Sequence, residues 1–144
     1  MLKALKQFLT LTAAEKRVFL RAWALLWVVD LGLRLVSLAK LHAWLGRGLP
    51  PEQALENPHQ LAWDTWRLVD AAARHHLVKM SCLRRTLVLQ RLLAAQGLRV
   101  GVTIGARKVE GELLAHAWIE VEGDAVGEAP GAAESFVTVM TLQP

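Results

Sequence analysis

Two residues have the clearest capacity for chemistry: Cys82, the only cysteine of the chain, and His116. Cys82 precedes an apolar stretch with helical spacing over 83–96, which Gly97 ends, so Cys82 is expected at a helix N-terminus. The positive end of the helix dipole favours a thiolate, and the free N–H groups of the first turn could stabilise an oxyanion. Both features suit a nucleophile, although a lone cysteine is more often a small buried residue.

His116 lies in the segment Ala115–Glu120, whose alternating pattern predicts a strand. An imidazole on a strand beside a helix-start thiol could act as the base of a thiolate–imidazolium pair. The competing interpretation is a structural histidine that finds its hydrogen-bond partner in the core. The order of cysteine, histidine and acid along the chain favours the catalytic interpretation.

Two acids follow the histidine, and the hairpin register decides between them. If residues 122–124 form a three-residue turn, Trp118 faces Glu128, and Glu128 shares the face of His116. A two-residue turn would place Glu128 on the opposite face. Asp124 lies in the turn, too far along a strand that rises about 3.3 Å per residue. We therefore expect Glu128 as the orienting acid, with Asp124 as the alternative and neither acid as a third outcome.

The elements expected around these residues form an α+β arrangement, with helices first and a small antiparallel sheet after them. Thr12 and Glu15 have the spacing of a capping box, and a long helix over 13–38 follows them. The segment Gly46–Pro58 is rich in Gly and Pro and is expected as a loop. The remaining expected elements are a helix over 59–75, strands around 100–104, 114–121 and 125–128, and an edge strand over 136–142.

At 144 residues the chain is long enough for one hydrophobic core, so we expect a single domain over 1–144. Within it, residues 1–58 form an N-terminal helical part and loop, and residues 59–144 form the catalytic core. The most apolar stretch, residues 22–39, contains Asp30 and Arg34, which favours a buried helix over a membrane-spanning one. Peripheral contact with a membrane is left open.

The charge and the single cysteine limit the partners and the location. The formal net charge is +4 without a basic block or interleaved aromatic residues, which argues against nucleic acid. An anionic membrane or an acidic peptide fits this charge. One cysteine allows neither an internal disulfide nor a cysteine-based zinc site, and no metal or cofactor is expected. The N-terminus lacks the features of a secretory signal, so a cytoplasmic location is expected.

Aromatic residues other than His116 have mainly structural interpretations. Trp118 either shields the site from water or belongs to the core. His75 and His76 beside Lys79 lack an acid or thiol to complete a metal site, so they indicate a solvated helix end. The tryptophans at helical spacing are interpreted as packing residues: Trp23, Trp27, Trp63 and Trp66.

Three arginines, Arg84, Arg85 and Arg91, lie on the expected nucleophile helix. A solvated face is the favoured interpretation. Docking of an acidic peptide is the alternative.

Several segments together resemble a known family. They are Cys82-Leu83-Arg84-Arg85-Thr86-Leu87-Val88-Leu89, Leu92-Leu93, Gly97, Val102-Thr103-Ile104-Gly105 and Ala115-His116-Ala117-Trp118-Ile119-Glu120-Val121. These segments are similar to the leader peptidases of lasso-peptide biosynthesis, which are transglutaminase-like cysteine proteases. The resemblance runs from about Leu61 to Glu128, and Leu11–Leu45 looks like that family's N-terminal helices. The family usually has an aspartate where this chain has Glu128.

The resemblance implies a transglutaminase-like, papain-like core in which Cys82, His116 and Glu128 are catalytic. It implies a cysteine peptidase that removes the leader from a ribosomally made lasso-peptide precursor. The chain begins directly with peptidase helices, so the split form is expected, with a separate leader-recognition protein as partner. The core peptide would then pass to a macrolactam synthetase. Two alternatives remain: acyl transfer to an amine, and a non-catalytic scaffold in a membrane-associated complex with Cys82 buried and inert.

Overall fold

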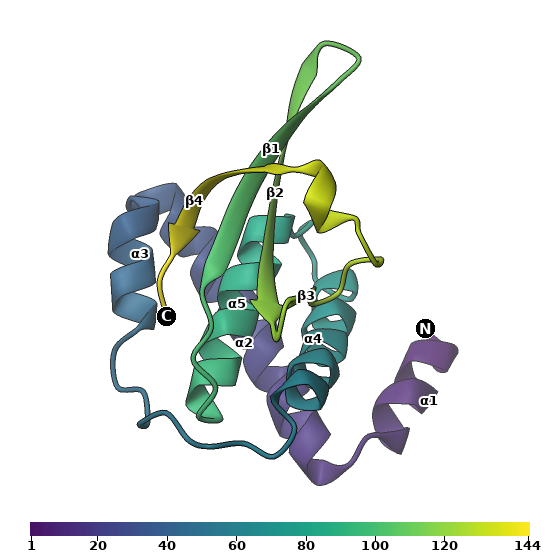
Figure 1. Cartoon of the computed structure of the whole chain (residues 1–144). Coiled ribbons are helices and arrows are strands. Elements are labelled where there is room, and N and C mark those ends of the chain that lie inside the picture. The colour runs from purple at the N-terminus through teal and green to yellow at the C-terminus, as the bar shows by residue number, and fades with distance from the viewer.

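The computed structural model describes residues 1–144, and its helices precede its strands along the chain (Figure 1). The helices are α1 (Leu2–Thr10), α2 (Ala13–Leu35), α3 (Leu38–Leu45), α4 (Pro58–Arg74), α5 (Cys82–Ala95) and the 3-10 helix η1 (Ala133–Ser135). The strands are β1 (Val102–Val109), β2 (Glu112–Val121), β3 (Asp124–Ala125) and β4 (Val137–Leu142). The predicted α+β class is therefore confirmed.

The four strands form one antiparallel sheet in the order β3-β2-β1-β4. Strands β1 and β2 are joined by the two-residue turn Glu110-Gly111, whose positive φ angles suit a tight hairpin. The tip of this hairpin projects beyond the helices in Figure 1. Strand β4 pairs with the outer side of β1, as expected for an edge strand.

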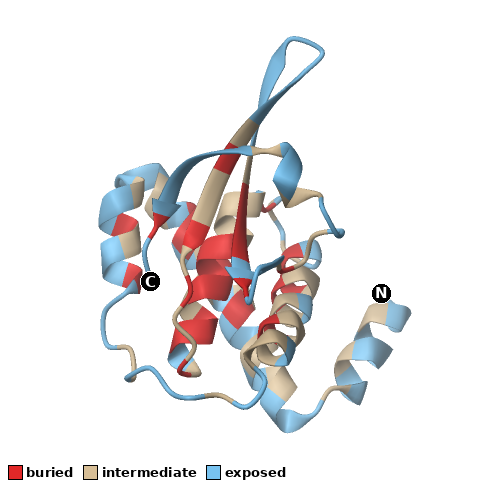
Figure 2. Cartoon of the chain, viewed as in Figure 1, coloured by how far each residue is buried: buried red, intermediate tan, exposed pale blue.

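Helix α5 lies at the centre of the molecule. It contacts α2 and α4 as well as β1 and β2, so it joins the helices to the sheet. Leu87, Val88 and Leu93 on this helix are fully buried, and Figure 2 shows the buried residues concentrated where α5 meets its neighbours. Burying these side chains supplies much of the hydrophobic stabilisation and fixes the helix that begins with Cys82.

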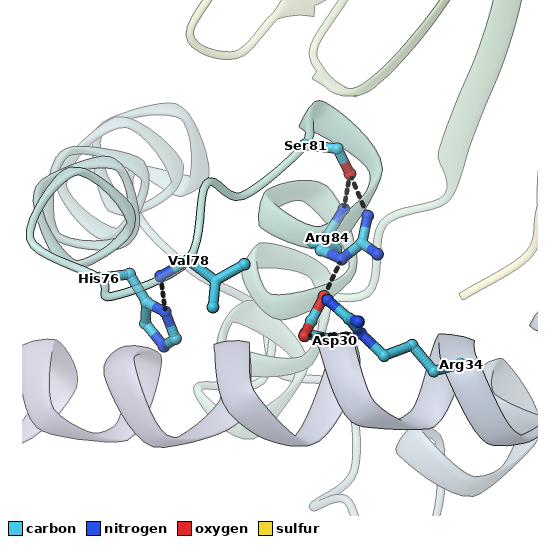
Figure 3. Close-up of polar contacts among 6 residues, drawn as sticks. All are labelled: Asp30, Arg34, His76, Val78, Ser81 and Arg84. Carbon is cyan, nitrogen blue, oxygen red and sulfur yellow. Dashed lines mark hydrogen bonds and ion pairs between the residues drawn. The ribbon is translucent and has the colours of Figure 1, made fainter.

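A buried carboxylate connects α2 to the first turn of α5. The Oδ1 atom of Asp30 accepts a hydrogen bond of 2.7 Å from Arg84 Nε, and Oδ2 accepts one of 3.1 Å from Arg34 Nε (Figure 3). Arg84 also donates from Nη1 to Ser81 Oγ, 3.0 Å away, on the residue that caps α5. Because a buried charge is costly without partners, these contacts bind the two helices in one register.

The same contacts set the ionisation of Asp30. Burial alone raises the pKa of this carboxyl group. The hydrogen bonds and positive charges of Arg34 and Arg84 outweigh that effect and hold the pKa below its ordinary value of 3.8. Asp30 is therefore ionised throughout the neutral range.

The N-terminal half differs from its prediction at the helix ends. The predicted capping box is present, with Thr12 and Glu15 bonded to each other's backbone N–H groups. The helix expected to reach residue 38 ends at Leu35, because the chain becomes extended and Ser37 caps a separate helix, α3. Helix α1 was also not predicted. None of the helices combines the length and apolar character needed to cross a membrane.

The prediction of a solvated arginine face on α5 is wrong. Besides Arg84, Arg85 donates to Asp70 Oδ1 at 2.7 Å, and Arg91 donates to the carbonyl of Leu45 at 2.9 Å. Each arginine thus cross-links α5 to another segment. These guanidinium groups form hydrogen bonds within the protein, and docking of an acidic leader on this helix stays a prediction.

The histidines after α4 have different environments. His75 is exposed, as predicted, but His76 lies against the indole rings of Trp23 and Trp27, with centroid distances of 5.1 and 4.6 Å. The prediction of a solvated end is therefore wrong for His76.

No group of three or more His, Cys, Asp and Glu side chains could hold a metal ion. Two further predicted packing residues contact the core: Trp63 and Trp66.

Removal of the buried carboxylate should show its role in stability. A carboxyl group with a lowered folded-state pKa stabilises the protein above its unfolded pKa, and this stabilisation disappears as the pH falls through the folded-state value. We therefore expect Asp30→Asn to lower the melting temperature by several degrees at pH 7, with the difference from wild type shrinking below about pH 4. Thermal melts from pH 7 to pH 3 measure this difference.

Asp64→Asn provides the matched control, because Asp64 pairs with Arg67 on the surface of α4. Its melting temperature should stay close to that of wild type. A stability difference for Asp30→Asn that is absent at pH 7, or unchanged down to pH 3, would contradict the assignment.

Candidate active site

Cys82 is the first residue of α5, and it lines a pocket between this helix, β2 and the segment after β3. The pocket has a volume of about 360 Å³ and is also lined by His116 and Glu128. Cys82 is half-buried, so its thiol is neither sealed in the core nor freely exposed. Ser81 caps the helix by accepting a hydrogen bond from the N–H of Arg84. The structure thus places the predicted nucleophile at a helix N-terminus and in one pocket with its predicted partners.

A buried hydroxyl group joins the start of α5 to β2. Thr86 Oγ1 lies 2.7 Å from the carbonyl oxygen of Cys82 and 3.1 Å from that of Ala117. Its single hydrogen can be donated to either oxygen, so Thr86 links Cys82 on α5 to Ala117 on β2, the residue next to His116. The positions of α5 and β2 are therefore coupled next to the reactive side chains.

The imidazole of His116 is held by two neighbouring aromatic rings and by a contact at one ring nitrogen. Its ring stacks against Trp118 at a centroid distance of 5.8 Å and lies 5.4 Å from the ring of Phe136. The Nε2 atom is hydrogen-bonded to Glu128 Oε1. Because the carboxylate engages Nε2, Nδ1 is the ring nitrogen that is free of this contact.

The hairpin between β2 and β3 differs from its prediction. Glu120 pairs with Ala125 and Val121 pairs with Asp124, so the turn contains only Glu122 and Gly123. Both turn residues have positive φ, as a tight two-residue hairpin requires. The predicted three-residue turn is therefore wrong.

Glu128 nevertheless reaches His116, because the strand does not continue. Strand β3 ends at Ala125, and the chain turns at Gly127, where φ is +82° and the N–H of Glu128 donates to the Ala125 carbonyl. The alternation of faces applies only along a continuous strand. The turn at Gly127 thus redirects Glu128 toward the imidazole.

Asp124 has a different partner. Its Oδ2 atom lies 3.0 Å from His59 Nε2 on α4, and its side chain is 69% exposed. The structure therefore brings Glu128 to His116 and leaves Asp124 outside that contact.

Two glycines make room for aromatic rings around the site. A Cβ atom at Gly127 would lie 2.2 Å from Trp66 Nε1, and a Cβ atom at Gly105 would lie 2.7 Å from the ring of Trp118. Gly105 is also the strand partner of His116. The absence of side chains at these positions allows the aromatic rings to pack close to the backbone.

Sequence reasoning did not identify Thr86, Phe136 or Gly127 as parts of the site. Thr86 had a usable signal, because a threonine one turn after a helix-start nucleophile lies on the same helix face. Gly127 and Phe136 had none, since their roles depend on contacts with Trp66 and His116 that form only in the folded chain.

A larger hollow adjoins the pocket. It has a volume of about 550 Å³, and Trp118 and Glu128 line both spaces. Trp118 is buried, so it belongs to the core and also forms a wall of the site. Acidic side chains line the hollow, among them Glu120, Asp124 and Glu134. A substrate segment that extends from the reactive pocket into this hollow would meet negative charge.

A family model described as the transglutaminase-like superfamily matches residues 25–141. The chain belongs to the transglutaminase-like superfamily. This match includes Cys82, His116 and Glu128. It supports cysteine-dependent chemistry in general, of the protease or acyl-transfer kind. No curated protein and no solved structure matched the chain.

The turn that carries Glu128 depends on close packing of Gly127 against Trp66, and a substitution at Gly127 tests this packing. Gly127→Ala would place a methyl group against Trp66 at a positive φ angle, so we expect a loss of about 2–4 kcal/mol in the free energy of unfolding. Gly123→Ala is the matched control, because Gly123 also has positive φ but has open space around its Cβ position. Denaturant titrations of the two variants give the comparison.

The control should lose only the backbone cost of about 1 kcal/mol. Equal losses in the two variants would show that contact with Trp66 does not shape this turn.

Proposed function

We propose that the chain is a cysteine peptidase that removes the leader peptide from a lasso-peptide precursor. The observation that carries the proposal is the arrangement of Cys82 at the start of α5 and His116, bonded to Glu128, in one pocket. Membership in the transglutaminase-like superfamily supports the cysteine chemistry. The resemblance of the segments around Cys82 and His116 to lasso-peptide leader peptidases supports the substrate.

The proposed reaction begins with transfer of the Cys82 proton to His116 Nδ1. The thiolate attacks the carbonyl carbon of the last leader residue, and the N–H groups at the start of α5 stabilise the resulting oxyanion. His116 then protonates the leaving nitrogen, which releases the core peptide with a new N-terminus. Water, deprotonated by His116, attacks the thioester and frees the leader, and Cys82 recovers its proton.

Glu128 acts through the imidazole in this reaction. Its carboxylate accepts a hydrogen bond from Nε2, which directs Nδ1 toward the thiol and stabilises the imidazolium ion. The stacked Trp118 and the nearby Phe136 limit rotation of the ring. A glutamate in place of the family's usual aspartate reaches the imidazole because the turn at Gly127 adjusts the backbone.

The partners of this reaction belong to the same proposal. A separate leader-recognition protein would present the precursor, and a macrolactam synthetase would receive the core peptide in the cytoplasm. Since the arginines of α5 are engaged by other groups of the chain, the leader would be held mainly by the recognition protein.

Acyl transfer to an amine is the second candidate. The superfamily match supports this chemistry as well as proteolysis, and the acidic hollow beside the pocket could attract a cationic amine substrate. The reaction would share the acyl-enzyme and differ only in the nucleophile that releases it. The scaffold alternative requires a buried, inert Cys82, whereas this residue is half-buried and lines the pocket.

Cleavage of a lasso precursor in the presence of its leader-binding protein tests the proposal. Mass spectrometry should show one cut at the leader junction with wild type and none with Cys82→Ala. Glu128→Gln should lower kcat about 10- to 1,000-fold, because the neutral amide orients the imidazole without stabilising its charge. Addition of a primary amine should leave the free leader as the main product if the chain is a peptidase.

Asp124→Asn is the matched control for Glu128→Gln, because Asp124 pairs with His59 and not with His116. Its activity should stay near that of wild type. Cleavage by Cys82→Ala at the wild-type rate would refute cysteine catalysis, and a leader–amine adduct as the main product would favour acyl transfer.

A further inference from the structure

The net positive charge of the chain lies in its N-terminal segment. Residues 1–24 contain five of the 17 Lys and Arg residues but only one of the 13 Asp and Glu residues, Glu15. This segment therefore carries the whole formal net charge of +4, and the other 120 residues are neutral overall. The one acid is used in the helix cap, where it accepts a hydrogen bond from the N–H of Thr12.

Helix α1 presents apolar side chains to the solvent. Leu2, Leu5 and Leu9 are 78%, 56% and 62% exposed, and no residue of the helix is buried. Figure 2 shows α1 at the edge of the molecule without a buried segment. Its contact with the body includes the ring of Phe8, which lies 5.3 Å from the ring of Phe19 on α2.

The exposed leucines lie on one side of α1. At about 100° per residue, Leu2, Leu5 and Leu9 fall within an arc of about 60°. Lys3 and Lys6 lie beside this arc, on the flank opposite the ring that contacts α2. We call these five residues the N-terminal patch. Its leucine ridge with lysines alongside is the arrangement of helices that lie in the plane of a membrane surface.

Neighbouring residues of α2 strengthen the positive charge near the patch. Arg17 and Arg21 are exposed and have no acidic partner, and Leu20 between them is 56% exposed. Lys16 joins the two helices, because its Nζ donates to the carbonyl of Leu9 at 3.3 Å. The patch is thus attached to a cationic helix start.

We propose that the N-terminal patch docks the chain on the surface of a bilayer that contains anionic lipid. The leucines would enter the boundary between headgroups and acyl chains, and the lysines would contact lipid phosphates. A second copy of the chain is a poor occupant, because it would bring the same positive charges together. An acidic amphipathic peptide is less well matched, since the exposed leucines lie outside the apolar hollow that α1 forms with α2 and α4. This proposal does not depend on the peptidase function.

Co-sedimentation with lipid vesicles tests the docking surface. The full chain should bind vesicles of phosphatidylcholine with phosphatidylglycerol, bind phosphatidylcholine vesicles at least tenfold more weakly, and dissociate at high salt. Lys3→Gln combined with Lys6→Gln should weaken binding to the anionic vesicles about 30-fold. Leu5→Gln combined with Leu9→Gln should weaken it at least about tenfold.

Matched controls lie at the tip of the β1–β2 hairpin, where Leu113 and Lys108 are exposed. Leu113→Gln combined with Lys108→Gln should bind as wild type does. Circular dichroism of every variant checks that the fold is retained, which is expected because all the substituted side chains are exposed. Equal binding to neutral and anionic vesicles, equal loss in the control, or binding only to an acidic amphipathic peptide would overturn the proposal.

Discussion

The ion pair between Asp30 and Arg84 is the contact on which the position of Cys82 depends (Figure 3). A buried carboxylate is strongly unfavourable without partners, so the packing of α2 against α5 is most favourable in the register that brings these groups together. Arg84 lies in the first turn of α5 and also contacts the capping residue Ser81. The interaction that stabilises the helix pair therefore also determines where Cys82 lies.

The rest of the site is built onto this fixed helix start by two further segments. Strand β2 supplies His116 and is joined to α5 through the hydroxyl of Thr86. The segment after β3 supplies Glu128 through a turn at Gly127 that fits against Trp66. Each segment is anchored by a close contact next to its candidate catalytic side chain. In the proposed reaction, such anchoring would keep the reacting groups oriented before substrate binds, which is what efficient covalent catalysis requires.

Local signals in the sequence were sufficient for the class of fold and for most of its elements. The capping box before α2 and the helix start at Cys82 were predicted, because each depends on residues close together in the chain. The two-residue turn after β2 was not predicted. The turn at Gly127, which packs against Trp66 of α4 and brings Glu128 to His116, was not predicted either. The arginines of α5 were assigned to solvent because their partners, such as Asp70, are distant in sequence.

The rate of Cys82 alkylation by iodoacetamide measures most directly whether the thiol and the imidazole act as a pair. Cys82 is the only cysteine, so the modified mass reports this residue alone. At pH 6, wild type should react at least about tenfold faster than His116→Ala, because the imidazolium ion stabilises the thiolate. Equal rates for the two proteins at this pH would contradict a catalytic pair of Cys82 and His116.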